Sequence, residues 1–270
     1  MKLEVANRII DLYARGEAGA TSSVAIAFRL RAKLAHQADD LINAEKFATK
    51  AIEVVNKLPE DRINPFDRAE VYTTAGWVYA SLDNSERQKQ GVDLLLRARS
   101  DLNFLWDGWL RQELVPAKAE LNVADAEDRS AYVVNALANR YWFNAALQLA
   151  RVDAYLAETL SKDNAPDKNK TRQIVDCLLD GTSILELIVA GGETLSCANG
   201  GISIITKRIL FSCYASLADL FSNVGDVELS VEYFHAAKTT GEQILSVGTM
   251  NEGQQALYSR VCNILDRTET

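Results

Sequence analysis

Few residues in this chain have the types and spacing that catalysis requires. The sequence contains two histidines, His36 and His235, and both lie within expected helices, so a histidine general base has few candidates. Cys197 lies in the glycine-rich stretch ETLSCANGG, but no base can be assigned to it from the sequence. The same glycines form neither G-x-G-x-x-G nor a P-loop. We therefore expect no catalytic residue and no cofactor.

One acidic cluster has the chemistry of a metal site. Asp39, Asp40 and Glu45 in ADDLINAE supply carboxylates, which Mg²⁺ prefers and which helical prenyl-diphosphate enzymes use. A second acidic cluster on a facing helix is missing, and Asp39 and Asp40 fall where a turn between two helices is expected. The structural interpretation is favoured. An α-helical metal- or diphosphate-dependent enzyme using Asp39 and Asp40 is kept as the alternative.

Charge and composition argue against several classes of protein. The net charge of −8 and the pI near 5.0 disfavour a nucleic-acid surface, which needs clustered basic charge. We expect no secretory signal at the start and no membrane span, since no segment approaches the ~20 apolar residues that a span needs. Cys177, Cys197, Cys213 and Cys262 form no C-x-x-C pair. This spacing predicts buried thiols, no zinc site, and a cytoplasmic or nuclear location.

Helical periodicity and composition predict an all-α chain. Ala, Leu, Glu, Lys and Arg are plentiful, glycines and prolines are few, and no strand-like alternation flanked by Asn-Gly or Asp-Gly appears. We expect one domain over 1–270, with a subdivision near 161–170, into 1–160 and 171–270, as the alternative. The expected helical segments are 22–57 with a break near Asp39 and Asp40, 66–102 with a turn at DNSE, 126–160, 171–189, 202–247 with a break at VGD, and 254–266.

Two distant segments share a pattern of large and small residues. FRLRAKLAHQADDLINAEKFATKA, from Phe28, aligns without a gap with YASLADLFSNVGDVELSVEYFHAA, from Tyr214. The matched pairs include Phe28 with Tyr214, Ala32 with Ala218, Leu34 with Leu220, Asp40 with Asp226, Ala44 with Ser230, Phe47 with Tyr233, and Ala51 with Ala237. Antiparallel helices approach closely only where small side chains face each other. Such a pair must stack on neighbours to bury its remaining face.

This pattern resembles the tetratricopeptide repeat. The signature positions of the late pair are filled by Tyr214, Leu217, Ala218, Phe221, Gly225, Ser230, Phe234 and Ala237. In the middle pair Tyr72, Gly76 and Tyr79 match, whereas Gln88, Val92 and Leu95 follow the pattern poorly; in the first pair Arg31 replaces a leucine. The signature covers about three helix pairs, without a steady ~34-residue period. The resemblance implies antiparallel helix pairs stacked as a right-handed superhelical array with irregular spacing.

The resemblance also implies a peptide-binding groove. In tetratricopeptide arrays the first helices of successive pairs line a concave surface that takes an extended or helical peptide. By helical spacing, the residues expected there include Arg29, Lys33, His36, Glu70, Thr73 and Trp77. Arg29 and Lys33 are four residues apart and share a face, so a basic spot beside Trp77 predicts an acidic or aromatic partner segment. The alternative, with both cations merely solvated and Trp77 in the core, stays open.

Removing the cations Arg29 and Lys33 is expected to leave folding nearly unchanged. Neither side chain is predicted to fill the core or to hold a buried charge, so the expected shift is ~0.5 kcal/mol, as for surface substitutions.

A second contact surface is predicted from Trp106 and Trp109, which lie three residues apart in FLWDGWL and share a face if the segment is helical. Aromatic residues at an irregular break often anchor interfaces, and packing between helix pairs is the alternative. Taken together, the sequence favours a non-enzymatic protein-interaction scaffold or adaptor. The alternatives are the enzyme described above and a structural segment of a larger assembly subunit.

Overall fold

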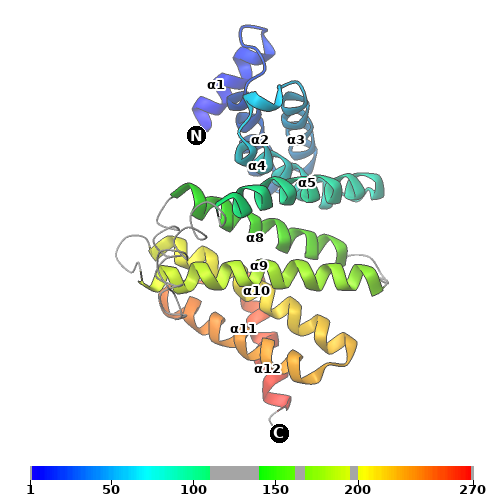
Figure 1. Cartoon of the computed structure of the whole chain (residues 1–270), viewed down its shortest axis with the longest axis vertical. Coiled ribbons are helices and arrows are strands. Elements are labelled where there is room, and N and C mark those ends of the chain that lie inside the picture. Colours follow the sequence, from blue (N-terminus) through cyan, green and yellow to red (C-terminus); the bar gives the residue numbers. More distant parts are fainter. Residues whose placement is uncertain (1, 110–139, 162–167, 195–199, 269–270) are drawn as a thin grey trace. The chain divides into compact units, whose positions relative to one another are not determined.

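The computed structural model describes residues 2–109, 140–161, 168–194 and 200–268 (Figure 1). Within these ranges the chain is all-helical, with ten α-helices and no strand, which confirms the predicted all-α class for the described part. The helices are α1 (Leu3–Ala14), α2 (Ser22–Gln37), α3 (Leu41–Asn56), α4 (Pro65–Ala80), α5 (Ser85–Trp109), α8 (Arg140–Ser161), α9 (Lys168–Thr194), α10 (Gly200–Val224), α11 (Val227–Val247) and α12 (Glu252–Thr268). A one-turn 3-10 helix, Glu60–Arg62, lies between α3 and α4.

Several helices run beyond the limits predicted from the sequence. α5 continues to Trp109, through FLWDGW, where irregular structure was predicted after residue 102. α9 continues to Thr194, through Ala-Gly-Gly, where a break was predicted after residue 189. The predicted helix over 126–160 is observed from Arg140, and residues 126–139 lie outside the described residues. α1 was not predicted from the sequence.

The chain divides into two compact units. Unit 1 comprises Met1–Gly108 and Glu158–Asp163, and unit 2 comprises Trp109–Ala157 and Asn164–Thr270. The chain therefore first leaves unit 1 after Gly108, a point that neither composition nor a linker marks in the sequence. The segment near 161–170, where the alternative subdivision was placed, contains only the last crossing between units.

In unit 1, α2 and α3 form a helical hairpin (Figure 1). α2 begins after Thr21, whose hydroxyl accepts a hydrogen bond from the Val24 N–H at 3.3 Å. The small residues that the sequence pattern placed between the helices are fully enclosed: Ala32, Ala44 and Ala51 are each at most 1% exposed. Because alanine has a short side chain, the two backbones can approach closely along this line. α1 and α4 pack against this hairpin.

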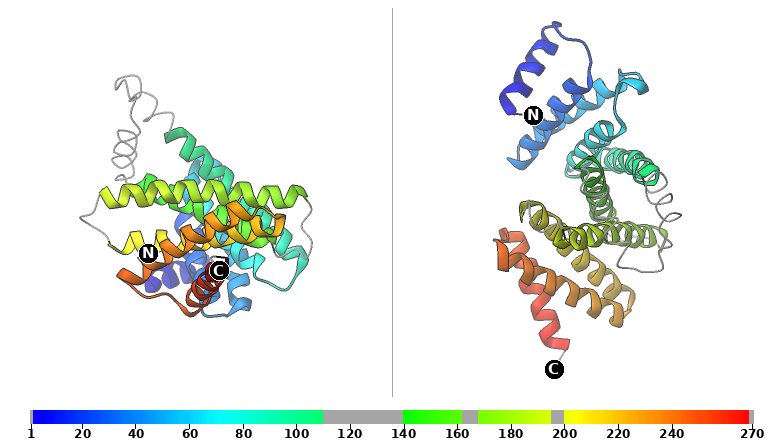
Figure 2. Two further views of the ribbon diagram at one scale, coloured as in Figure 1. Left: turned by 90° about the horizontal axis from the view of Figure 1, so that it is seen from below. Right: turned by 60° about the vertical axis from the view of Figure 1, so that its left-hand side comes forward.

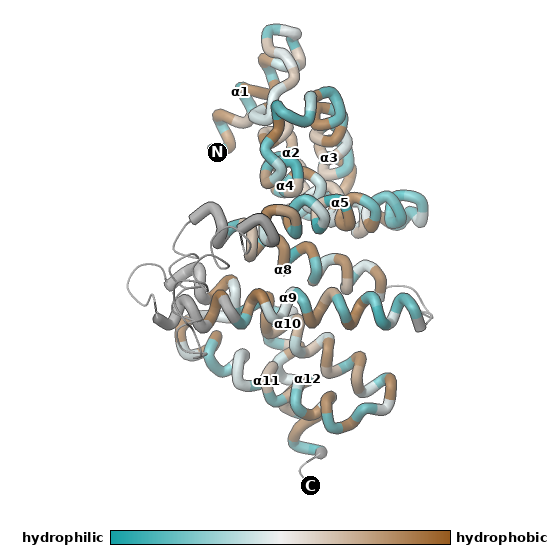
Figure 3. Tube along the Cα trace, viewed as in Figure 1, coloured by the Kyte–Doolittle hydropathy of each residue, from teal (hydrophilic) through white to brown (hydrophobic). Residues whose placement is uncertain are grey.

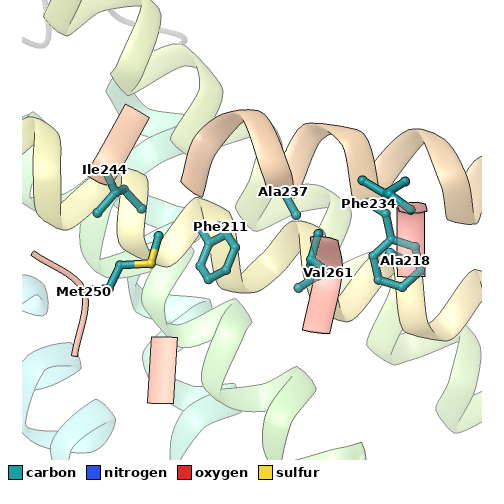
Figure 4. Close-up of a cluster of buried hydrophobic side chains, with 9 residues drawn as sticks. Phe211, Ala218, Phe234, Ala237, Ile244, Met250 and Val261 are labelled. Carbon is teal, nitrogen blue, oxygen red and sulfur yellow. The ribbon is translucent and has the colours of Figure 1, made fainter. Parts of the chain in front are cut away.

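In unit 2, α10 and α11 form the matching hairpin (Figure 2). Its core contains Phe211, Ala218 and Phe234 from these helices, and α12 adds Val261 (Figure 4). Leu265 of α12 belongs to the same buried cluster. The Ser230 hydroxyl, at the position of Ala44, donates to the Ala218 carbonyl oxygen at 2.9 Å. The small residues thus occupy the same place in both hairpins.

The two hairpins have turns of the same type. Asp39 has φ 59° and Gly225, at the matched position, has φ 83°, so both turns require the left-handed conformation. The next residue caps the second helix in each case. Asp40 Oδ1 accepts from the Asn43 N–H at 3.1 Å, and Asp226 Oδ1 accepts from the Leu229 N–H at 3.2 Å. Asp39 thus occupies the left-handed position of the turn, and Asp40 caps α3.

The middle pair, α4 and α5, departs from the pattern for a simple reason. Gly76 and Gly91 face each other so closely that a Cβ on either would lie under 3 Å from the backbone of the other helix. Twelve residues separate Ala32 from Ala44, whereas fifteen separate Gly76 from Gly91, so this turn is longer. Once that insertion is allowed, the packed positions of α5 are Gly91, Leu95 and Ala98, all buried. A gapless comparison instead selected Gln88 and Val92 and therefore matched poorly.

The helices carry hydrophilic and hydrophobic residues in alternation along their length (Figure 3). In the part of the chain that the structure describes, no helix has both the length and the apolar content to cross a membrane.

Candidate partner-binding surface on α2 and α4

The surface predicted from the sequence lies on two helices that pack side by side in unit 1. α2 and α4 are in contact. α2 carries Arg29, Lys33 and His36, and α4 carries Glu70, Thr73 and Trp77. The residues that meet across the two helices are 41 positions apart in the sequence: Arg29 meets Glu70, and His36 meets Trp77. The structure therefore brings together four of the six predicted groove residues.

Arg29 and Glu70 form an ion pair across α2 and α4. Arg29 Nη1 donates to Glu70 Oε1 at 3.1 Å, and the two side chains are only 18% and 22% exposed. The Arg29 Nε–H is also buried and finds no acceptor among the described residues. The expectation that removal of Arg29 would leave no buried charge is therefore wrong, because Glu70 would lose its partner in a poorly hydrated place.

Asp67, one turn before Glu70 on α4, also faces this ion pair. Burial raises the pKa of the Asp67 carboxyl, and the positive charge of Arg29 partly opposes that rise. The cation thus has two carboxyl groups of α4 within electrostatic reach, and only Glu70 is hydrogen bonded to it.

His36 and Trp77 form the aromatic part of the surface. Their ring centroids lie 3.8 Å apart, with the planes tilted by 39°, and both side chains are half-buried. The stack is one turn of α2 beyond Lys33, whose side chain is exposed. Trp77 is therefore neither a fully enclosed core residue nor a fully exposed one.

Thr73 differs from the other predicted residues. It is 2% exposed, and its hydroxyl donates to the Ala69 carbonyl oxygen at 2.7 Å within α4. A hydroxyl bonded to its own helix and enclosed by packing offers little to a partner. The sequence pattern counted helix turns correctly but could not show that this position is buried.

The second predicted surface is only partly described. Trp106 is half-buried on α5, and Trp109 is the last residue of that helix, but the Trp109 side chain lies outside the described residues. Their three-residue spacing on a continuous helix is as predicted, whereas their role stays a prediction.

The remaining candidates from the sequence are the acidic cluster and the cysteines. Among the described residues, no three His, Cys, Asp or Glu side chains form a group that could hold a metal ion. Cys177 and Cys213 are buried, and Cys262 is half-buried. Burial, and then the charge of Asp153, raises the pKa of the Cys213 thiol to about 12. Cys197, in the glycine-rich stretch, lies outside the described residues.

Unit 2 contains a counterpart of the α2–α4 contact that sequence analysis missed. Asp219 on α10 pairs with both Nη atoms of Arg260 on α12, at 2.6 and 3.0 Å, again 41 positions apart. α12 therefore contacts α10 through residues with the same sequence separation as those that join α4 to α2. A weak signal of this contact is present in the sequence. The alignment of Phe28 with Tyr214 has an offset of 186 residues, and at that offset Tyr72 of α4 matches Tyr258 of α12.

Comparison with known proteins finds no matching family model, no similar curated protein and no similar solved structure.

Proposed function

We propose that this protein is a non-enzymatic interaction scaffold or adaptor, built from tetratricopeptide-like helix pairs, that holds a segment of a partner protein along α2 and α4. The right-handed superhelical stacking of successive pairs belongs to the same proposal. The observation that carries it is the recurrent 41-residue contact between first helices, Arg29 with Glu70, His36 with Trp77, and Asp219 with Arg260. Stacked first helices in a fixed register form a continuous face.

The composition of this face in unit 1 supports a binding role. Trp77 combines a large apolar ring with a partly exposed position, and tryptophan and arginine are the residues that most often dominate binding energy at interfaces. Lys33 is exposed one turn away, and Arg29 is held in place by Glu70. An aromatic stack flanked by charge suits a partner segment with acidic or aromatic side chains.

A charge reversal on the face tests the proposal. We expect Lys33→Glu to weaken capture of the protein's partners from a cell extract, read by quantitative mass spectrometry, with its largest effect at low salt. Lys46→Glu is the matched control, because Lys46 is an exposed lysine on α3, away from this face. Both variants should unfold at nearly the wild-type temperature. Equal retention of partners by the two variants would remove α2 from the binding surface.

A further inference from the structure

α2 differs in charge from every other described helix. It carries Arg29, Arg31 and Lys33 and no Asp or Glu, whereas the other described helices have net charges between −2 and +1, counting Lys and Arg against Asp and Glu. The whole chain has a net charge of −8. A helix with three cations and no acid is therefore a local exception in an acidic protein, and it is complementary to a negatively charged ligand.

Arg31 does not contribute to the face shared with α4. Its guanidinium lies over the Phe47 ring, 5.2 Å from the centroid, and so is directed towards α3. Arg29 and Lys33 remain on the α4 side, four residues apart, with the His36–Trp77 stack beyond them. These are the residues that an acidic segment lying along α2 would meet.

Arg29 is less completely hydrogen bonded than Arg68 and Arg260, two other arginines that pair with a carboxylate. Arg68 uses Nε and Nη2 on the two oxygens of Asp101, at 2.8 and 2.7 Å, and Arg260 holds Asp219 with two bonds. Arg29 makes one bond, to Glu70 Oε1, and its Nε–H has no acceptor among the described residues. A guanidinium has five donors in a fork that fits a carboxylate, so a single bond leaves much of this capacity unused.

We propose that Glu70 is an internal stand-in for a carboxylate of an acidic partner segment, so that the segment binds along α2 by displacing Glu70 from Arg29. The inference rests on the proposed function and adds the partner's chemistry and a built-in competitor. Glu70 keeps Arg29 hydrogen bonded when no partner is present. Because the segment binds Arg29 only when Glu70 has left it, the apparent affinity for the segment is the intrinsic affinity multiplied by the fraction of time that Arg29 is unoccupied. Partner carboxylates that also reach Lys33, which is exposed and lies four residues from Arg29, meet a second cation of α2.

Replacing Glu70, a residue of the binding face itself, is expected to strengthen binding of the acidic segment. In Glu70→Gln the amide has the size of the carboxylate but no charge, so it holds Arg29 more weakly and the ligand displaces it more readily. The probe is a fluorescein-labelled octamer of glutamate, titrated by anisotropy at low ionic strength. If Glu70 occupies Arg29 about nine-tenths of the time, the affinity rises about tenfold, and Lys33→Ala lowers it several-fold.

Glu45→Gln is the matched control for charge. Glu45 also pairs with an arginine in unit 1, Arg87, at 2.8 Å, but that pair joins α3 to α5 away from this face. An equal rise in both variants would show a mere change of net charge and overturn the assignment. Absence of binding by wild type and Glu70→Gln alike would also overturn it, and would leave capture by the α2–α4 face to be judged by the Lys33→Glu experiment.

Discussion

The hairpins α2–α3 and α10–α11 are built on the same plan from different side chains. In both, a residue with positive φ precedes an aspartate that caps the second helix, and an aromatic pair joins the helices. The ring centroids of Phe28 and Phe47 are 6.4 Å apart, and those of Tyr214 and Tyr233 are 6.1 Å apart, with similar tilts of 32° and 37°. Matched geometry from unlike residues indicates that spacing, and not residue identity, defines the pair.

The elements that precede the two hairpins meet them at the same position. In unit 1, Tyr13 of α1 packs edge-on against Phe28 at 5.9 Å. In unit 2, the Tyr214 hydroxyl donates to Glu186 of α9 at 2.6 Å, and burial together with this carboxylate raises the pKa of Tyr214. One contact is apolar and the other polar, yet both attach the preceding helix to the start of the hairpin.

The residue types of the two hairpins differ on the face where the first helix of each hairpin, α2 or α10, meets the helix that follows the hairpin, α4 or α12. At matched positions, α2 has Arg29, Lys33 and His36, whereas α10 has Ala215, Asp219 and Ser222; α4 has Glu70 and Trp77, whereas α12 has Ala256 and Asn263. The packed positions are alike because the hairpin requires them. The outer positions are under no such constraint, and their divergence is what a surface specialised in one unit would show.

The largest effect on stability is expected where the two cores differ in size. Phe234 is 3% exposed, and the matched residue is Ala48. Phe234→Ala should lower the free energy of unfolding by about 3–5 kcal/mol, because it removes a buried ring and leaves a cavity. Denaturant titration measures this loss. Phe104→Ala is the control, since Phe104 is 73% exposed, and it should have little effect. Similar losses for both variants would contradict the packing described for unit 2.

A smaller and asymmetric effect is expected at the shared turn. Gly225→Ala should cost about 1–2 kcal/mol, since a residue with a Cβ is strained at this φ. Asp39→Gly should change stability by less, because aspartate tolerates the left-handed region better and glycine adds entropy to the unfolded chain. Thermal unfolding compares them, with Gly19→Ala as a control at an open site. The turns would not be equivalent if Asp39→Gly were the more damaging change.

The helix pairs were predictable because their signals are local. Small residues at Ala32 and Ala44 and a capping residue at Asp40 are read directly from spacing. The lengths of α5 and α9 were not, since FLWDGW departs from the repeat spacing and the glycines after residue 190 were taken as a helix stop. A glycine inside a helix costs only ~1 kcal/mol, which tertiary packing can offset.

The contacts of the candidate surface were less predictable than its location. Helical spacing placed Arg29 and Glu70 on facing helices, but only the three-dimensional register shows that they pair with each other. The register of successive helices depends on the length of the intervening turn, as Gly76 and Gly91 illustrate. For the same reason, the burial of Thr73 could not be deduced from its place in the helix.

An exchange of faces between the two units tests the central claim most directly. Four residues of unit 1 would be replaced by their unit 2 counterparts: Arg29→Ala, Lys33→Asp, His36→Ser and Glu70→Ala. Arg29 and Glu70 change together, so the Glu70 carboxylate is not left without its hydrogen-bond partner. Thermal unfolding should shift by only a few degrees, while capture of partners and binding of the glutamate octamer should both be lost. A folded exchange variant that still captures partners at the wild-type level would contradict the assignment of binding to α2 and α4.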